Sequence, residues 1–190
     1  MRSHFRHSLI TRLENLYCPQ HWFSSKVGKY HHKFGHGRFK FGAWRVYAAS
    51  DVGHTLPGGS VVRNMETSFE VLSINGKGGL KEVSEYSKDE GNTKVVEEKA
   101  VKEDIAMKDG ILLRAYPQSG RTHQICLHCQ YLGISIIGDV KYEGVYEWKD
   151  TTYDAHELHA ESLSLEHPVT GVEIRLRAPL PSWANQALQP

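Results

Sequence analysis

The stretch YPQSGRTHQICLHCQYLGISIIGDVKY, residues 116–142, gathers side chains that commonly do chemistry within one short run. It holds an arginine, a threonine, two histidines and two cysteines. Three interpretations are open: a metal site, a thiol redox site and a site that binds an anionic substrate. Each makes a different demand on the rest of the chain.

A metal site would be built on Cys126, His128 and Cys129, with His123 nearby. Zinc in proteins is held by four converging ligands, usually as two pairs separated by a loop. One such pair is present, and a second would have to come from scattered side chains, namely Cys18, His31, His32 and His36. We therefore predict that the chain holds no metal.

A redox site would use Cys126-Leu-His-Cys129 as a C-x-x-C motif. Such a motif is reactive when a helix N-terminus lowers the pKa of its first thiol. Cys126 is expected about one turn inside a helix, which weakens this interpretation. A structural role, with both cysteines buried as small apolar groups, is favoured over thiol chemistry and over zinc binding.

An anion site would be built where a strand turns into a helix. A strand is predicted over 111–117, a turn at Gly120, and a helix from about Thr122 to Leu132 that ends at Gly133. The start of a helix favours an anion, and Arg121 adds a bidentate donor. These residues suit a bound carboxylate or phosphate, but they name no reaction.

Further strands are predicted over 44–50 and 67–74, and a hairpin with a Val-Thr-Gly turn is predicted near the end of the chain. Residues 15–45 contain several glycines with little periodicity and are predicted to be irregular. The stretch 76–109 is dominated by Lys and Glu and is predicted to be a surface excursion. Together these patterns predict an α+β fold with a mainly antiparallel, mixed sheet and few helices.

The composition is that of a soluble globular chain, with 39% hydrophobic and 24% charged residues. No apolar run approaches the ~20 residues that a membrane span requires, so no membrane partner is predicted. Three unevenly spaced cysteines favour a reducing, intracellular compartment, either the cytoplasm or an organelle. The first residues, MRSHFRHSLITR, contain no acidic residue and so faintly resemble an organelle presequence, but the stretch is short and has no clear amphipathic pattern. The choice between cytoplasm and organelle therefore stays open.

Basic and aromatic residues are interleaved between Glu14 and Asp51, an interval without any acidic residue. Cations neutralise phosphates and rings stack on bases, so this stretch suits a nucleic-acid strand. A solvated loop whose rings pack against the domain explains the same composition, and both interpretations stay open. The basic candidates for RNA binding are Lys29, Lys33, Arg38 and Lys40.

Two blocks of the sequence resemble the RluA-type RNA pseudouridine synthases. SGRTHQI followed by LHCQYLGISIIGDVKY is similar to that family's signature, and ELHAESLSLEHPVTGVEIRLRAPLP is similar to its closing strands. KFGAWRVYAASDVGHTLPGG resembles a segment of the plant-type members. The resemblance covers roughly residues 40–75 and 110–183.

The resemblance implies an isomerase that breaks the N-glycosidic bond of a uridine in RNA, turns the base and rejoins it through carbon. It implies tRNA or rRNA as the partner, and neither cofactor nor metal. One catalytic Asp would act on a flipped-out nucleotide and pair with the motif arginine, here Arg121. The other substrate-binding positions that it implies are Leu113, Thr122, His123, Gln124 and Tyr47.

One departure from the family bears directly on activity. The catalytic Asp of the family lies in an H-R-L-D-x-x-T-S-G segment upstream of the motif, and that segment is absent from the sequence. Arg12-Leu13-Glu14 has Glu in place of Asp and no Thr-Ser-Gly after it, so we interpret it as a coincidence. The chain is expected to be inactive alone, and a non-catalytic RNA-binding remnant is the alternative.

The same comparison predicts the domain organisation. Residues 44–183 are expected to form the C-terminal part of a synthase catalytic domain, interrupted by the charged insertion at about 76–109. Residues 1–43 are expected to be an irregular basic and aromatic segment, and residues 184–190 a tail. The synthase-like sheet is therefore expected to be incomplete.

Overall fold

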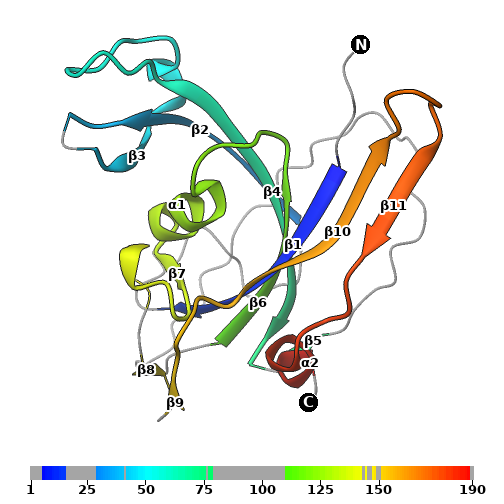
Figure 1. Cartoon of the computed structure of the whole chain (residues 1–190). Coiled ribbons are helices and arrows are strands. Elements are labelled where there is room, and N and C mark those ends of the chain that lie inside the picture. Colours follow the sequence, from blue (N-terminus) through cyan, green and yellow to red (C-terminus); the bar gives the residue numbers. More distant parts are fainter. Residues whose placement is uncertain are drawn as a thin grey trace, which may run out of the picture.

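The structure is a computed structural model that describes residues 6–15, 29–40, 42–75, 77–78, 110–142, 144, 147–148 and 151–188. Figure 1 shows its elements, with short 3-10 helices labelled η in the text. In chain order they are β1 (Arg6–Asn15), β2 (Lys29–Arg38), β3 (Trp44–Tyr47), η1 (Ala49–Asp51), β4 (Arg63–Ile74), β5 (Lys77–Gly78), β6 (Gly110–Pro117), α1 (Gln124–Tyr131), β7 (Ile134–Ile136), η2 (Val140–Tyr142), β8 (Glu147–Trp148), β9 (Thr151–Thr152), β10 (Leu158–Glu166), β11 (Glu173–Arg177) and α2 (Ser182–Leu188). The predicted charged insertion at 76–109 lies outside the described residues apart from β5.

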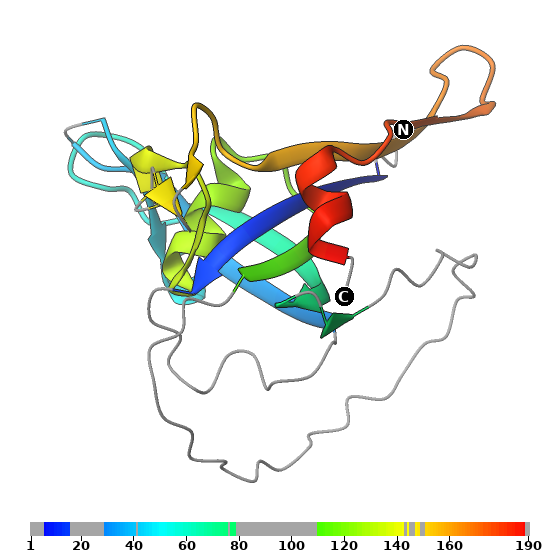
Figure 2. The same cartoon turned by 90° about the horizontal axis from the view of Figure 1, so that it is seen from below.

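One large sheet organises the described part of the chain. Its strands are hydrogen-bonded in the order β11-β10-β1-β6-β4-β2-β3, with β5 paired to β4 and β7 paired to β1. Each pairing between these strands is antiparallel. The predicted α+β class, with a mainly antiparallel sheet and few helices, is confirmed. Figure 2 shows the predicted hairpin, β10–β11, extending away from the rest of the sheet.

The two faces of the sheet carry two apolar clusters. Alternation along β6 places Ile111, Leu113 and Ala115 in one cluster and Leu112 in the other. The first cluster includes the apolar residues of α1, and the second includes Ala184 of α2. Each helix therefore covers one face. Neither helix of the described ranges has the length and apolar character needed to cross a membrane.

The prediction that residues 15–45 are irregular is wrong for β2, which pairs with β3 on one side and β4 on the other. β2 follows a strand period, because His32 and His36 are buried while Lys29, His31 and Lys33 are exposed. The apolar role in this pattern is taken by histidines, which a hydrophobicity pattern counts as polar. The expected irregular segment also contains β1, and the expected tail begins inside α2.

The glycines of β2 were interpreted as breakers but serve close packing. A Cβ atom added to Gly35 would lie 2.6 Å from Val62 Cγ1 and 3.0 Å from the carbonyl oxygen of Ala48. Only glycine lets the loop that follows β3 approach the strand this closely. The glycine therefore positions the loop that forms one wall of the pocket described below.

A buried ionic network ties four strands together at Arg114 of β6, whose side chain is 2% exposed. Its Nε donates to Glu161 Oε2 at 2.7 Å and its Nη2 to Glu161 Oε1 at 2.9 Å. Ser8 donates to the same carboxylate at 3.0 Å, and Nη1 of Arg114 lies 3.4 Å from Glu70 Oε2. Burial alone would lower the pKa of Arg114, but the bonds and charge of Glu161 raise it. The Arg114 guanidinium therefore keeps its charge in the core.

Candidate functional site

The turn between β6 and α1 places the motif arginine. His123 has a left-handed backbone with φ of 55°, and α1 begins at Gln124 rather than at the predicted Thr122. A left-handed residue cannot continue a right-handed helix, so Arg121 and Thr122 lie in the turn before it. The predicted helix is confirmed with this shift of its first residue.

The Gln124 side chain fixes this turn. Its Oε1 accepts hydrogen bonds from the Arg121 backbone N–H at 3.0 Å and from Ser119 Oγ at 2.9 Å. Its Nε2 donates to the Glu66 carbonyl and to Thr67 Oγ1, both at 2.9 Å. The two donors and two acceptors of the amide are thus used. Because the Arg121 N–H is occupied by Gln124, the part of the site open to an anion is the guanidinium rather than this backbone amide.

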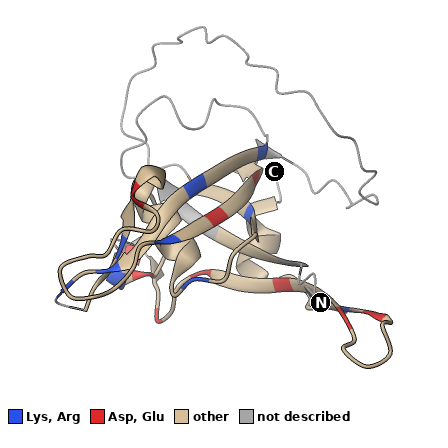
Figure 3. Ribbon diagram, turned by 90° about the horizontal axis from the view of Figure 1, so that it is seen from above, with Lys and Arg blue, Asp and Glu red and all other residues tan. Residues whose placement is uncertain are grey.

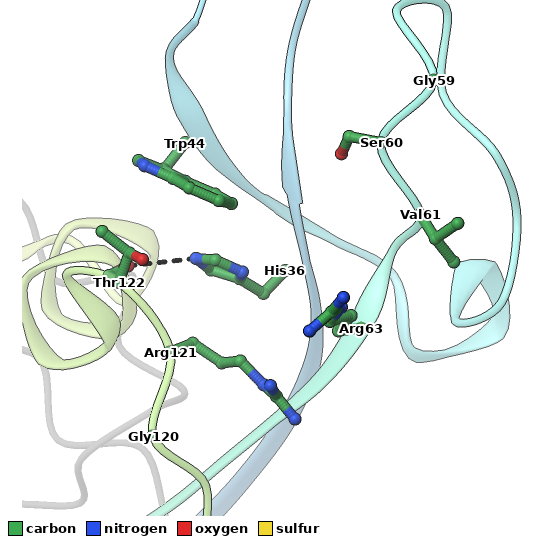
Figure 4. Close-up of a pocket in the computed structure, with 9 residues that line it drawn as sticks. All are labelled: His36, Trp44, Gly59, Ser60, Val61, Arg63, Gly120, Arg121 and Thr122. Carbon is green, nitrogen blue, oxygen red and sulfur yellow. Dashed lines mark hydrogen bonds between the residues drawn. The ribbon is translucent and has the colours of Figure 1, made fainter.

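The Arg121 guanidinium reaches a pocket at the edge of the sheet, shown in Figure 4. Its Nε donates to the backbone carbonyl of Asn64 at 3.0 Å, which holds the side chain across the start of β4. The pocket has a volume of about 450 Å³, within the range usual for small-ligand sites. It is lined by His36, Trp44, Gly59, Ser60, Val61, Arg63, Gly120, Arg121 and Thr122.

A stacked pair of rings forms one side of the pocket. The rings of His36 and Trp44 lie 4.6 Å apart at 18°, and His36 Nε2 lies 3.0 Å from the Thr122 carbonyl oxygen. A carbonyl can only accept, so Nε2 carries the proton of the neutral imidazole. Burial lowers the pKa of His36, and although the bond to Thr122 opposes this, the charge of Arg121 adds to the lowering. The pocket thus combines a neutral ring pair with two guanidinium groups, those of Arg63 and Arg121.

No carboxylate among the described residues contacts the Arg121 guanidinium or lines the pocket. The register pairs Glu14 with Gly110 at the start of β6, whereas Arg121 follows the end of that strand. At ~3.3 Å per residue, the length of β6 separates the Glu14 backbone from that turn by about 20 Å. Asp139 is buried elsewhere, beside Cys126. The interpretation of Glu14 as a coincidence agrees with this geometry.

The structure places the predicted site residues in different surroundings. Of the motif residues beside Arg121, Thr122 lines the pocket, Gln124 holds the turn, and the Nδ1 atom of His123 and the hydroxyl of Tyr142 share a hydrogen bond. Leu113 has no exposed surface and lies in the first apolar cluster, and Tyr47 packs on the glycines of β2. The basic candidates Lys29, Lys33, Arg38 and Lys40 are exposed along β2 and its turn.

Of the lining residues that were not predicted as site residues, three bring a ring or a charge to the pocket. His36 and Trp44 fall within the basic and aromatic stretch of the sequence. The composition of that stretch suggested nucleic-acid binding, but it did not indicate that these two side chains lie beside Arg121. Arg63 lies between the predicted strands 44–50 and 67–74, and no motif of the sequence pointed to it. The strand pairing β3-β2-β4 brings all three together, and that pairing is not visible in a local pattern.

Both helical cysteines lie in environments that disfavour the thiolate. Burial, followed by the hydrogen bond and charge of Asp139, raises the pKa of Cys126 to about 12. Burial also raises the pKa of Cys129, which has no exposed surface. These surroundings argue against redox chemistry at the C-x-x-C motif. Within the described ranges, no group of three His, Cys, Asp or Glu side chains is placed to hold a metal ion.

The sequence is similar to two plant proteins over most of its length. It is 64% identical to RNA pseudouridine synthase 1 of rice (Oryza sativa subsp. japonica) over 155 residues, which make up 80% of this chain and 45% of the relative. It is 59% identical to RNA pseudouridine synthase 1 of Arabidopsis thaliana over 79% of this chain and 46% of that relative. The chain thus spans about half the length of the curated relatives it matches. No family model matches it.

Bacterial relatives and solved structures extend the similarity. The chain is 40% identical to ribosomal large subunit pseudouridine synthase D of Vibrio cholerae over 79 residues. It shares its fold with human RNA pseudouridylate synthase domain containing 1, with a TM-score of 0.56 and 16% identity over 93% of this chain and 55% of that one. The identity to these relatives supports membership of the RluA-type RNA pseudouridine synthase family, in its plant-type branch, and the solved structure shares the fold.

Proposed function

We propose that this chain provides the uridine-binding side of an RNA pseudouridine synthase. In this reaction the C1′–N1 bond of a uridine breaks and a C1′–C5 bond forms, while C5 loses a proton and N1 gains one. The observation that carries the proposal is the Arg121 guanidinium, held by Asn64 at the edge of a pocket of about 450 Å³.

The geometry of Arg121 suits a carboxylate partner. Its Nε is bonded to the Asn64 carbonyl, and its two Nη atoms make no hydrogen bond to the described residues. A guanidinium directed into a pocket in this way would keep a facing Asp ionised and aimed. The His36 ring, held by the Thr122 carbonyl, adds an aromatic surface to the wall of the pocket.

The partner we propose is uridine-containing RNA, and tRNA and rRNA remain the two classes to compare. Relatives of this chain are named for RNA and for the large ribosomal subunit. The pocket is lined by two arginines and no acid, which favours a polyanion. The predicted basic candidates Lys29 and Lys33 lie on the opposite face of β2 from His36, each opposite a glutamate of β4, so they are not part of this lining.

We propose that the 190 residues do not complete the isomerisation alone, because the sequence lacks the H-R-L-D-x-x-T-S-G segment of the family. The test compares the 190-residue chain with an extended form in which that segment is joined upstream. Both are incubated with uridine-containing tRNA and rRNA fragments, and pseudouridine is measured by mass spectrometry of the digested RNA. We expect product only with the extended form, and loss of product when that form carries Arg121→Ala.

Arg121→Lys in the extended form is the matched control, because it keeps the charge and removes the bidentate fork. It is expected to retain little of the activity. Product from the 190-residue chain itself would show that a resident carboxylate serves the reaction. Full activity of the extended Arg121→Ala form would overturn the assignment of the pocket.

A second function, RNA binding without catalysis, is favoured by one observation: the pocket is basic and aromatic but has no acid in its lining. This function predicts RNA affinity that falls steeply with salt and no pseudouridine from either form. Pseudouridine formation by the extended form decides between the two.

A further inference from the structure

A second hollow continues the pocket toward the turn between β2 and β3. It has a volume of about 490 Å³ and is lined by Arg38, Phe39, Lys40, Gly42, Gly58 and Ser60. Ser60 lines both hollows, and its Oγ accepts a hydrogen bond from the Arg38 backbone N–H at 3.0 Å. We call this second hollow, together with Trp44, the hairpin groove. The groove and the Arg121 pocket form one continuous path along the edge of the sheet.

The charge along this path has one sign. The pocket presents Arg63 and Arg121, and the hairpin groove presents Arg38 and Lys40, with no acidic residue in the lining of either hollow. Figure 3 shows Lys and Arg on the strands and turns of this part of the molecule. A linear polyanion, rather than a single anion, matches cations distributed over two adjoining hollows.

An aromatic platform, the Trp44 ring, lines the Arg121 pocket and lies close to Arg38 of the second hollow. Trp44 is half-buried, with His36 stacked on its ring and the Arg38 guanidinium 5.9 Å from its ring centre. His36 is in turn fixed by the Thr122 carbonyl, so the indole is supported from below by a rigid ring (Figure 4). Supported aromatic rings beside cations are the usual means by which proteins bind unpaired bases.

We propose that the hairpin groove binds the single-stranded RNA segment next to the target uridine, with one base stacked on Trp44 and its phosphates paired with Arg38 and Lys40. This proposal rests on the proposed function, which places the target uridine in the Arg121 pocket. It adds a direction for the strand, from that pocket past Ser60 toward the β2–β3 turn. Stacking needs an unpaired base, so an RNA duplex is not the ligand of this groove.

The test measures binding of a labelled, uridine-containing single-stranded RNA of about ten nucleotides to the whole chain by fluorescence anisotropy. Trp44→Ala is expected to weaken binding by roughly 5- to 100-fold, since base stacking on an aromatic ring has an effect of this size. Trp44→Phe keeps a ring on His36 and is expected to retain most of the affinity. Circular dichroism of each variant checks that the fold is kept.

The phosphate contacts are tested through the salt dependence of binding between about 50 and 200 mM salt. The double variant Arg38→Gln/Lys40→Gln is expected to reduce the slope of log K against log salt by about 1.4, from two contacts of ~0.7 each for a single strand. The matched control is Arg175→Gln/Arg177→Gln, which removes the same charge from β11 at the opposite edge of the sheet. It is expected to leave the slope unchanged.

Three results would overturn the groove assignment: wild-type affinity in Trp44→Ala, an equal loss in Trp44→Phe, or equal competition by duplex RNA of the same length. These outcomes are separate from the catalytic proposal. If the extended form makes pseudouridine while Trp44→Ala binds normally, the groove is wrong and the proposed function stands. If Trp44→Ala weakens binding but no form makes pseudouridine, the groove stands as a site for single-stranded RNA, and its relation to a target uridine falls with the catalytic proposal.

Discussion

Lowering the pH from 7 to about 4.5 is expected to destabilise the fold through His128. This side chain has no exposed surface, and its ring lies 5.5 Å from the ring of Phe34 and 6.0 Å from that of Phe69. Its Nδ1 lies 2.8 Å from Thr67 Oγ1, while Nε2 has no hydrogen-bond partner among the described atoms. Burial, followed by the charges of neighbouring histidines, lowers the pKa of His128 from 6.5 to about 3.

The magnitude follows from the difference between the folded and unfolded pKa values. Because the folded pKa is lowered, the stabilisation is fully present above about pH 6.5 and is lost as the pH falls toward about 3. Each pH unit between these values removes about 1.4 kcal/mol. Between pH 7 and 4.5 the free energy of unfolding should therefore fall by about 2–3 kcal/mol from this residue. Burial also lowers the pKa values of His32 and His36, which act in the same direction.

Urea unfolding at several pH values, followed by circular dichroism, measures this loss. Two matched variants isolate His128 from the other histidines: His128→Phe, which fills the site without titrating, and His128→Gln, which keeps an acceptor for Thr67. Each has its own cost at pH 7, so the comparison concerns the slope with pH. Between pH 7 and 4.5 both variants should lose less of their free energy of unfolding than the wild type does. The difference should be close to the about 2–3 kcal/mol attributed to His128. Parallel pH profiles for the wild type and both variants would refute the reasoning.

Three further changes test other parts of the structure. Arg114→Ala is expected to destabilise the fold by about 3 kcal/mol in urea unfolding, because the buried Glu161 carboxylate loses its bidentate partner and keeps only Ser8 and the more distant Arg177, 3.8 Å away; a loss under 1 kcal/mol would contradict the buried network. Gly35→Ala should cost about 1–3 kcal/mol in urea unfolding through its clash with the loop, whereas Gly120→Ala, with open space around its added Cβ, should cost far less in the same measurement. Cys126, with a pKa of about 12, should react with iodoacetamide at pH 8 much more slowly in the folded chain than in urea, as peptide mapping would show; equal rates would contradict its burial.

Patterns with a short period predicted the elements around the motif correctly. The strands predicted over 67–74 and 111–117 became parts of β4 and β6, and the helix that follows ends at Tyr131, two residues before Gly133, whose φ is 72°. The hairpin over β10 and β11 was also predicted, since its Val-Thr-Gly turn separates two alternating segments. Each of these patterns is formed by residues that are close together in the sequence, so it can be recognised without knowing which strands pair.

β1 and β2 were missed because their stability comes from partners far along the chain. β1 lies between β10 and β6, so its backbone hydrogen bonds are made to residues more than ninety positions away. β2 buries histidines and glycines, which count as polar or as breakers until their neighbours are known. The pocket was missed for the same reason, since His36, Trp44 and Arg63 meet only after β2 has paired with both β3 and β4.

The position of Arg121 depends on the same distant pairing. Its turn is fixed by Gln124, which bonds to the backbone of Glu66 and to Thr67, and Thr67 Oγ1 is in turn bonded to the buried ring of His128. Thr67 accepts from Gln124, so its hydroxyl proton has only His128 Nδ1 as an acceptor among the described residues. A charged His128 would have a proton on that nitrogen and could no longer accept. The guanidinium is therefore held by a chain of hydrogen bonds that requires a neutral imidazole in the core, which makes the protonation state of His128 part of the geometry of the pocket.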